Sequence, residues 1–524
     1  MHSPLVEALQ NPACYPHPVD TVDVVETHIS WVLLAGERVY KIKKPVDFGF
    51  LDFSTLDLRR YYCEEELRLN RRTAPELYLD VVAVTGSSAQ PRIAGGGDVL
   101  EYAVCMRRFD VEHGFDRLLV AGRLEPAHAE ALGEALADLH EQAEIAGSES
   151  PWGTPDEVIG PMRDNFTTLL ALVGDDSRDE RLNRLRAWTE DRFIELEEVL
   201  EQRRELGFVR ECHGDVHLGN VTLFDDRTTL FDCIEFSPAL RWTDVMADVA
   251  FAVMDLHDRG SGANAWRLLD RYLARTGDYE GLVLLDFYVV YRALVRAKVA
   301  ALGLEDGPAA DQTRSILAEV DRYLALADRV SRSQRPGLFL TCGVSGSGKS
   351  VLARSLVASC GMIRLRSDVE RKRLHGLDEL DRSGSDTGAG LYAPEATART
   401  YRRLVQLADA VSTAGLPVLV DATFLHEAQR APFRALAEDR EIPFGVLMCQ
   451  ASVDILRDRV ERRGQSGRDA SEADVAVLER QLETFEPCTS EEGPVRAVET
   501  TVANADEAAR AWVEERLSSA ATNG

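Results

Sequence analysis

One stretch of the chain has the residue types and the spacing of a phosphate-binding loop. Its sequence is GVSGSGKS over residues 343–350, which fits the pattern G-x-x-x-x-G-K-[ST] at every fixed position. Glycines allow the tight turns that point backbone N–H groups inward at a phosphate. Lys349 is expected to reach the β- and γ-phosphates, and Ser350 to ligate Mg²⁺. The predicted nucleotide site consists of Gly343, Ser345, Gly346, Ser347, Gly348, Lys349 and Ser350.

Acidic and amide residues in the first half of the chain form a second chemical pattern. Asp215 is followed by Asn220 and then by Asp232, the carboxylate that ends a strand predicted to begin at Thr229. Kinases use one carboxylate to orient or deprotonate the acceptor hydroxyl, and an amide and a second carboxylate to hold the metal ions that bridge the phosphates. Taken alone, Asp215 is equally consistent with a turn. Its order with Asn220, Asp232 and Lys41 favours catalysis.

This half of the chain resembles the aminoglycoside phosphotransferase-like branch of the protein-kinase-like fold, whose catalytic loop has the pattern H-x-D-x-x-x-x-N. The resemblance covers residues 20–325 and rests on His213, Asp215 and Asn220 in the catalytic loop. It implies that Asp215 is the base, that Asn220 and Asp232 bind metal, and that Lys41 positions the phosphates of ATP. Asp244 and Asp248 are expected to cap or brace the helix that follows.

The expected ion-pair partner of Lys41 lies on the next predicted helix. The resemblance favours Glu66, because Cys63, Glu66, Asn70, Arg71 and Arg72 match the family pattern C-x-x-E-x-x-x-N-R-R. Glu65 remains an alternative, since it lies nearer to the apolar line of that helix. No G-x-G-x-x-G loop precedes Lys41, and the triplet at Asp232 is Asp-Cys-Ile, not Asp-Phe-Gly. Both departures favour a small-molecule acceptor over a protein acceptor.

Charged residues after the phosphate-binding loop are candidates for a second catalytic set. Asp421 ends an apolar predicted strand, as a second-sphere Mg²⁺ carboxylate does, although a purely structural Asp is the alternative. Asp368 ends another strand and could accept a hydroxyl proton or cap a helix. Arg459 and Arg463 share one helix face and could close over the transferring phosphate or form a solvated basic face. This half resembles P-loop kinases of the gluconate-kinase-like, zeta-toxin-like and polynucleotide-kinase-like groups.

Hydrophobic patterning predicts the elements that position these residues. Residues 20–45 alternate as in a β-hairpin with its turn at 35–37, and Ser54 or Thr55 begins a helix that ends near Arg72. Beyond residue 337, strands alternate with helices, which predicts a parallel α/β sheet. Other strands are expected over 81–84, 99–105, 338–342, 363–366, 418–421, 444–449 and 496–499, and helices over 127–142, 180–206, 243–258, 264–276, 281–303, 309–330 and 506–517.

The predicted fold class is multidomain α/β, in which a two-lobed protein-kinase-like fold precedes a P-loop kinase-type parallel sheet. The expected parts are a kinase-like N-lobe over 1–105, a helical C-lobe with the catalytic loop over 106–330, a linker over 331–337 and a P-loop domain over 338–524. The polar linker is broken by Pro336 and Gly337. A length of 524 residues also favours more than one hydrophobic core.

Composition excludes several classes of protein. The net charge of −28 disfavours a nucleic-acid or anionic-membrane partner. Nine cysteines without a C-x-x-C pair argue against a zinc framework or a disulfide scaffold and favour the reducing cytoplasm. The sequence has no apolar run long enough to predict a membrane span, and the N-terminus has no signal-peptide pattern.

The sequence therefore predicts a bifunctional, ATP- and Mg²⁺-dependent phosphotransferase with two nucleotide sites. The acceptor at the first site is expected to be a hydroxyl of a small polar molecule such as a sugar or an aminoglycoside-like compound. One alternative is that one site senses ATP and gates the other. A second alternative is a polynucleotide 5′-end kinase in the P-loop half, which the net charge of −28 disfavours.

Overall fold

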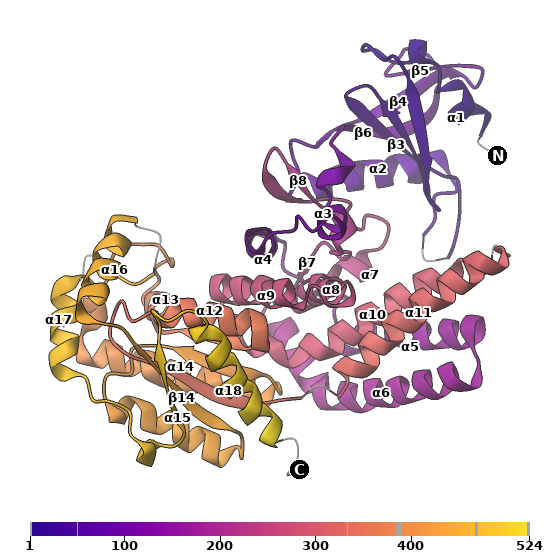
Figure 1. Ribbon diagram of the computed structural model, residues 1–524. Helices are drawn as coiled ribbons and strands as arrows, with labels where there is room; N and C mark the ends of the chain where they lie inside the picture. The colour runs from indigo at the N-terminus through magenta and orange to yellow at the C-terminus, as the bar shows by residue number, and fades with distance from the viewer. Residues whose placement is uncertain are drawn as a thin grey trace. The chain divides into compact units, whose positions relative to one another are not determined.

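The computed structural model describes residues 3–49, 51–305, 307–332, 334–383, 390–466 and 470–520. They form two compact units, Met1–Gly174 with Arg186–Asp255, and Asp175–Leu185 with Leu256–Gly524. The predicted class is confirmed, because the first unit carries a kinase-like sheet and the second a parallel α/β sheet (Figure 1). The four-part division with a linker at 331–337 stays a proposal. Within the described ranges, no helix has both the length and the apolarity to cross a bilayer.

An antiparallel sheet forms the N-terminal part of the first unit, and alternation along its strands determines where the lysines point. Tyr40 and Ile42 of strand β3 are buried in a core on one face of the sheet. Successive side chains of a strand point to opposite faces, so Lys41 and Lys43 both lie on the other face. The strand order is β1 (Val22–Glu26), β2 (Ser30–Ala35), β3 (Arg38–Lys43), β6 (Val99–Arg107), β4 (Tyr78–Ser87) and β5 (Gln90–Ile93).

Helix α2 (Leu56–Asn70) covers the sheet face from which Lys41 and Lys43 project. Thr55 caps its N-terminus, because its hydroxyl accepts a hydrogen bond from the backbone of Leu58. The helix packs on β4 and β6 through Cys63 and its neighbours. This packing brings the acidic residues of α2 to the lysines of β3.

Short strands and helices complete the first unit. The predicted strand that was to end at Asp232 is wrong in its end point, because β9 ends at Leu230 and Asp232 has the left-handed backbone conformation, with φ 61°. The elements are α1 (Pro4–Ala8), η1 (Pro12–Cys14), η2 (Val111–His113), α3 (Phe115–Val120), α4 (Pro126–Gln142), α5 (Pro155–Val173), α6 (Asp176–Glu205, shared with the second unit), β7 (Val209–Glu211), η3 (Leu218–Asn220), β8 (Val221–Phe224), β9 (Arg227–Leu230), α7 (Pro238–Arg241), β10 (Trp242–Asp244) and α8 (Val245–Asp258, also shared).

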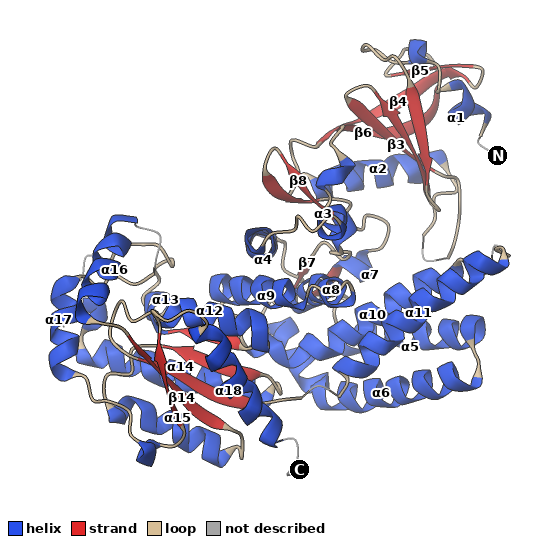
Figure 2. Cartoon of the chain, in the orientation of Figure 1, coloured by secondary structure: helices blue, strands red, loops and turns tan. Residues whose placement is uncertain are grey.

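The second unit is built on a parallel sheet, as predicted, with helices on both faces (Figure 2). Helices α12 and α18 pack on one face around Phe339, while α14 contacts β13 and β11 and α15 contacts β11. The strand order is β12 (Ile363–Arg366), β13 (Pro417–Asp421), β11 (Gly337–Cys342), β14 (Phe444–Gln450) and β15 (Val495–Glu499). The helices are α9 (Gly262–Thr276), η4 (Glu280–Leu284), α10 (Leu285–Leu302), α11 (Ala310–Val330), α12 (Lys349–Cys360), α13 (Ser367–Arg373), η5 (Gly390–Tyr392), α14 (Pro394–Thr413), α15 (Glu427–Asp439), α16 (Val453–Ser466), α17 (Val475–Thr484), η6 (Ser490–Glu492) and α18 (Ala505–Ala520).

Helix α9 is joined to the parallel sheet by a buried ion pair. The guanidinium of Arg364 on β12 donates to both oxygens of Asp270 on α9, at 3.2 and 2.7 Å. The two side chains are only 7% and 12% exposed, so water has little access and cannot solvate either charge if its partner is removed. The pair therefore ties a helix from the C-terminal part of the kinase-like segment to the P-loop sheet.

Asp270→Ala is expected to lower the free energy of unfolding by about 3–5 kcal/mol, because Arg364 then stays buried without a counter-charge. Urea unfolding of the full chain measures the change. Glu514→Ala, which breaks the exposed pair with Arg510, should cost less than about 1 kcal/mol. Similar losses in the two variants would show that the Arg364–Asp270 pair contributes no more than a surface pair.

Candidate active sites

Lys41 lies between two carboxylates of the first unit. Its Nζ is 2.6 Å from Oδ1 of Asp232 and 2.9 Å from Oε1 of Glu66. Glu66 is fully buried, whereas Glu65 pairs with Arg68 and Arg241. The geometry therefore places Glu66, and not Glu65, at Lys41.

The charges of this cluster stabilise one another. Burial alone would lower the pKa of Lys41, but the carboxylates of Asp232, Glu66 and Glu235 outweigh it and raise that pKa well above its usual value. Burial would raise the pKa of Glu66, but Lys41 and Lys43 outweigh it and lower that pKa. Lys41 and Glu66 are consequently both charged at neutral pH, as phosphate positioning requires.

The loop that carries Asp215 and Asn220 lies beside the segment of Asp232. The Asn220 amide donates to the carbonyl and to Oδ2 of Asp215, at 3.0 and 3.1 Å. The backbone N–H of Phe231 donates to the Asn220 carbonyl at 3.0 Å, and that of Ile234 to the His213 carbonyl at 3.1 Å. These bonds hold the loop of Asp215 and Asn220 against the segment that carries Asp232.

Two aspartates of α8 hold the ends of this loop. Asp248 accepts hydrogen bonds from the backbone N–H groups of His213 and Gly214, at 2.7 and 2.8 Å. Asp255, two helical turns later, accepts from the N–H of Leu218 at 2.8 Å. Of the two aspartates expected to cap or brace this helix, Asp244 caps it, because its Oδ1 accepts from the N–H of Met246 at 2.8 Å, whereas Asp248 holds the loop. The roles of Asp248 and Asp255 could have been predicted from the sequence, because a carboxylate on so apolar a helix must find buried hydrogen-bond donors.

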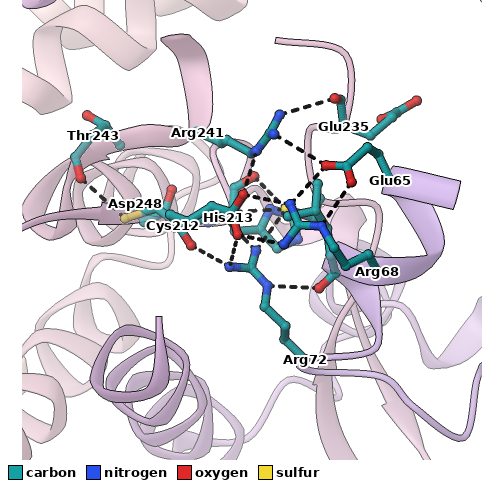
Figure 3. Close-up of polar contacts among 12 residues, drawn as sticks. Glu65, Arg68, Arg72, Cys212, His213, Glu235, Arg241, Thr243 and Asp248 are labelled. Carbon is teal, nitrogen blue, oxygen red and sulfur yellow. Dashed lines mark hydrogen bonds and ion pairs between the residues drawn. The ribbon is translucent and has the colours of Figure 1, made fainter. Parts of the chain in front are cut away.

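An arginine network connects α2 to the same loop, and Figure 3 shows Arg241 directed toward Glu65 and Glu235. Arg241 donates to Oε1 of Glu211 at 3.1 Å and to the backbone carbonyl of Glu235 at 3.1 Å. From α2, Arg68 donates to Oε1 of Glu211 at 2.7 Å, and Arg72, just beyond the end of the helix, donates to the Cys212 carbonyl at 3.1 Å. Helix α2 is thus fixed to the strand that enters the catalytic loop.

His213 is held as a neutral ring. Its Nε2 donates to the Phe231 carbonyl at 2.9 Å, and its Nδ1 accepts from the Asp215 N–H at 3.3 Å. Burial lowers the pKa of His213 below its ordinary 6.5, with Arg72 acting in the same direction and Asp248 and Asp215 opposing it. Protonation of Nδ1 would break the bond that fixes Asp215.

We expect a pH-dependent loss of stability from His213. Because the unfolded chain binds the proton more tightly, the contribution is complete above pH 6.5 and is lost as the pH falls below 6.5 toward the pKa of the folded state. His213→Asn should flatten the slope of unfolding free energy against pH in that window. The exposed His113→Asn is the control and should leave the slope unchanged. Equal slopes in wild type and His213→Asn would contradict this account.

The phosphate-binding loop lies between β11 and α12, which begins at Lys349. Gly346 and Gly348 have φ of 80° and 90°, and a Cβ on Gly346 would lie 2.7 Å from the Leu456 carbonyl, so other residues would be strained there. The Lys349 ammonium donates to the Val344 carbonyl at 2.9 Å. Burial lowers the pKa of Lys349, opposed chiefly by Asp421.

Two hollows adjoin this loop. A cavity of about 560 Å³ is lined by the loop, by the arginines Arg459 and Arg463 of α16, and by apolar residues such as Val498 and Val502. Arg459 also donates to the Gly346 carbonyl at 3.2 Å. The other hollow is lined by Lys349, Ser350, Asp368, Asp421 and Arg463, with Ser345, Arg366, Ser367, Ala422, Thr423 and Ser471. Six of the predicted residues, Ser345 among them, therefore line one hollow, whereas Arg459 lines only the larger cavity. The prediction that Asp368 ends a strand is wrong, because β12 ends at Arg366 and Asp368 lies in the first turn of α13.

Oxygen donors of the kind that Mg²⁺ prefers occur in both places. Asp232, with its side chain 42% exposed, and Asn220 supply them in the first unit. Ser350 and Asp421 supply them beside the phosphate-binding loop. The residues present fit the metal that the sequence implies at each site.

Two family models match the chain. One described as a phosphotransferase enzyme family matches residues 88–285, a range that contains Asp215, Asn220 and Asp232. The other, described as an AAA domain, matches residues 338–488 and contains the phosphate-binding loop. Lys41 and Glu66 precede the first range.

Similar proteins span most of the chain or one part of it. The uncharacterized protein Rv2004c of Mycobacterium tuberculosis H37Rv is 30% identical over 469 residues, 89% of this chain and 91% of the relative. Adenylyl-sulfate kinase of Myxococcus xanthus is 35% identical over 119 residues, 23% of this chain and 60% of that enzyme. The structure of choline kinase from Cryptosporidium parvum Iowa II aligns with 62% of this chain and 95% of its own, at 10% identity and a TM-score of 0.40.

Proposed function

We propose the reactions of this chain on the basis of its family. The chain belongs to the proteins that join an aminoglycoside phosphotransferase-like domain to a P-loop kinase domain. Both domains are of kinase families, so the chain is a phosphotransferase that is bifunctional in its architecture. Its first site transfers the γ-phosphoryl group of ATP to a hydroxyl of a small polar molecule, such as a sugar or an aminoglycoside-like compound. Its P-loop site phosphorylates a second small molecule.

One observation supports the first site above all. Lys41 and Asp232 are separated by 191 positions in the sequence, yet their side chains are hydrogen-bonded at 2.6 Å. The loop that carries Asp215 and Asn220 is hydrogen-bonded to the segment that carries Asp232. This juxtaposition supports the proposed roles of Lys41 as the phosphate-binding lysine, Asp215 as the base, and Asn220 and Asp232 as metal ligands, the set that phosphoryl transfer requires.

In the proposed reaction, Asp215 accepts the proton of the acceptor hydroxyl as its oxygen attacks the γ-phosphorus. The bond between that phosphorus and the β–γ bridging oxygen breaks, and ADP leaves. Lys41 binds phosphate oxygens and is held by Glu66. Mg²⁺ bound by Asn220 and Asp232 would neutralise charge on the phosphates.

At the P-loop site, backbone N–H groups and Lys349 hold the β- and γ-phosphates. The apolar side of the 560 Å³ cavity offers room for the base and ribose of the nucleotide. Asp368 accepts the acceptor's proton, and the arginines of α16 bind the transferring phosphate. Ser350 and Asp421 would hold Mg²⁺ at this site, and the phosphate-binding arginines of α16 are Arg459 and Arg463.

The experiment compares wild type, Asp215→Asn and Lys349→Ala with γ-labelled ATP, Mg²⁺ and a panel of sugars, aminoglycosides, other metabolites and oligonucleotides. Each variant should lose one set of labelled products and keep the other. Loss of neither set would refute the proposal. Nucleotide binding at both sites with turnover at one would identify an ATP sensor. A labelled oligonucleotide that disappears with Lys349→Ala would identify an end kinase.

A further inference from the structure

Lys43 is a second lysine on the α2 face of strand β3, and it is completely buried. Its Nζ donates to Oε2 of Glu66 at 2.7 Å and also to Oε1 of Glu235. The ammonium lies 4.9 Å from the ring centre of Phe53, which adds a cation–π contact. A lysine this deeply buried needs both counter-charges, because desolvation of an ammonium is very unfavourable.

Glu66 lies between the two lysines, with Lys43 at its Oε2 and Lys41 at its Oε1. Lys41 Nζ lies 2.9 Å from Oε1 of Glu66, so this ion pair uses the carboxylate oxygen that Lys43 leaves open. Lys41 makes its hydrogen bond to Asp232, at 2.6 Å. Lys43 therefore fixes one oxygen of the Glu66 carboxylate and leaves the other to the ion pair with Lys41.

Glu235 connects this lysine to the segment that carries Asp232. Its carboxylate pairs with Lys43, and its backbone carbonyl accepts from Arg241, the residue directed at it in Figure 3. The same segment is fixed to α2 at another point, where the N–H of Cys233 donates to Asn70 at 2.9 Å. Strand β3, helix α2 and residues 232–235 are consequently held as one assembly.

Charge balance gives this assembly a role in nucleotide binding. Lys41 must exchange Asp232 for phosphate oxygens when nucleotide arrives, and Asp232 must become available to metal. Without Lys43, the whole charge of Glu66 would act on Lys41, and its carboxylate would be free to turn toward that ammonium. Lys41 would then be held more tightly by protein and less by phosphate.

We propose that Lys43 is a positioning residue of the first nucleotide site, which keeps Glu66 in place so that Lys41 can transfer to the phosphates. The inference rests on the proposed function of that site. It adds a second lysine to the expected pair of Lys41 and Glu66, and it assigns Glu235 as the carboxylate that holds this second lysine against the Asp232 segment.

The test uses the full chain with Lys349→Ala as the parent, so that only the first site binds nucleotide. Lys43→Met is expected to raise the Kd for a non-hydrolysable ATP analogue with Mg²⁺ about tenfold. It also leaves Glu235 buried without a partner and should lower the midpoint of urea unfolding. Lys43→Met/Glu235→Gln removes that buried charge, so its midpoint should return toward that of the parent.

Affinity in the double variant separates positioning from simple stabilisation. We expect its Kd to stay about tenfold raised although stability is regained. Recovery of the parent Kd together with stability would overturn the proposal, as would an unchanged Kd in both variants. Lys44→Met, which removes the neighbouring pair with Glu26, is the matched control and should leave the Kd unchanged. A parent that binds no analogue would refute the proposed function of the first site, and the inference with it.

Discussion

Asp215→Asn is expected to lower phosphoryl transfer at the first nucleotide site by about 10²–10⁴-fold. Asparagine has the same shape but accepts a proton poorly, so the acceptor hydroxyl would attack without a base. The contacts around the loop favour correct folding of the variant, because Asp248 and Asp255 hold the loop through backbone N–H groups. Turnover should therefore fall while nucleotide affinity at that site changes little.

The measurement is transfer from γ-labelled ATP to the acceptor in a Lys349→Ala background, together with the Kd for nucleotide. Asp164→Asn, an exposed position on α5, is the control and should retain full turnover. If Asp215→Asn kept more than about a tenth of the parent rate, Asp215 would not be the base. A loss of nucleotide affinity equal to the loss of rate would instead point to collapse of the site.

Lys349→Ala should abolish function at the other site, with an expected loss of about 10²–10³-fold in turnover there. The reason is electrostatic, since Lys349 is the buried cation at the centre of the loop and no water-exposed residue can replace it. In the structure its ammonium is bonded to Val344 and Ser347 of the loop itself, contacts that phosphate oxygens can replace. Both nucleotide affinity and rate should fall.

This change is followed in an Asp215→Asn background, by nucleotide titration and by transfer to the acceptor of the P-loop site. Arg496→Ala, which removes an exposed cation of β15, serves as the control for net charge. Retention of high-affinity nucleotide binding at that site without Lys349 would exclude the loop as its phosphate cradle. The two variants together assign each product to one site.

Local patterns predicted much of the architecture. The phosphate-binding loop and the strand that precedes it are short-range signals, as is the alternation that placed Lys41 on β3, and the structure has these elements at the expected residues. Helix α5 was not predicted, because Gly160 and Pro161 interrupt its pattern while tertiary packing of Phe166 and its neighbours maintains the helix.

The remaining features depend on contacts between distant segments. The left-handed conformation of Asp232 ends the expected strand early, and nothing in an alternating pattern encodes it. The sequence did not predict a role for Lys43, because a lysine in a strand is normally exposed. Its two buried partners, Glu66 and Glu235, come from other segments of the chain. Asp248 and Asp255 similarly acquire their roles only when the catalytic loop folds onto α8.

The ion pair between Arg364 and Asp270 also bears on how far the two activities are modular. Around it, Gly361 lies against Trp266 of α9 so closely that a Cβ would be 2.8 Å from the indole, and Arg373 donates to the Ala274 carbonyl. A gene fragment that began at residue 338, where the match to the AAA-domain model begins, would leave α9 behind and expose the surface that it covers. The boundary between the two family matches in the sequence therefore differs from the boundary between the two compact units of the folded chain. Recombination that exchanged the P-loop half alone would have to supply a replacement for α9.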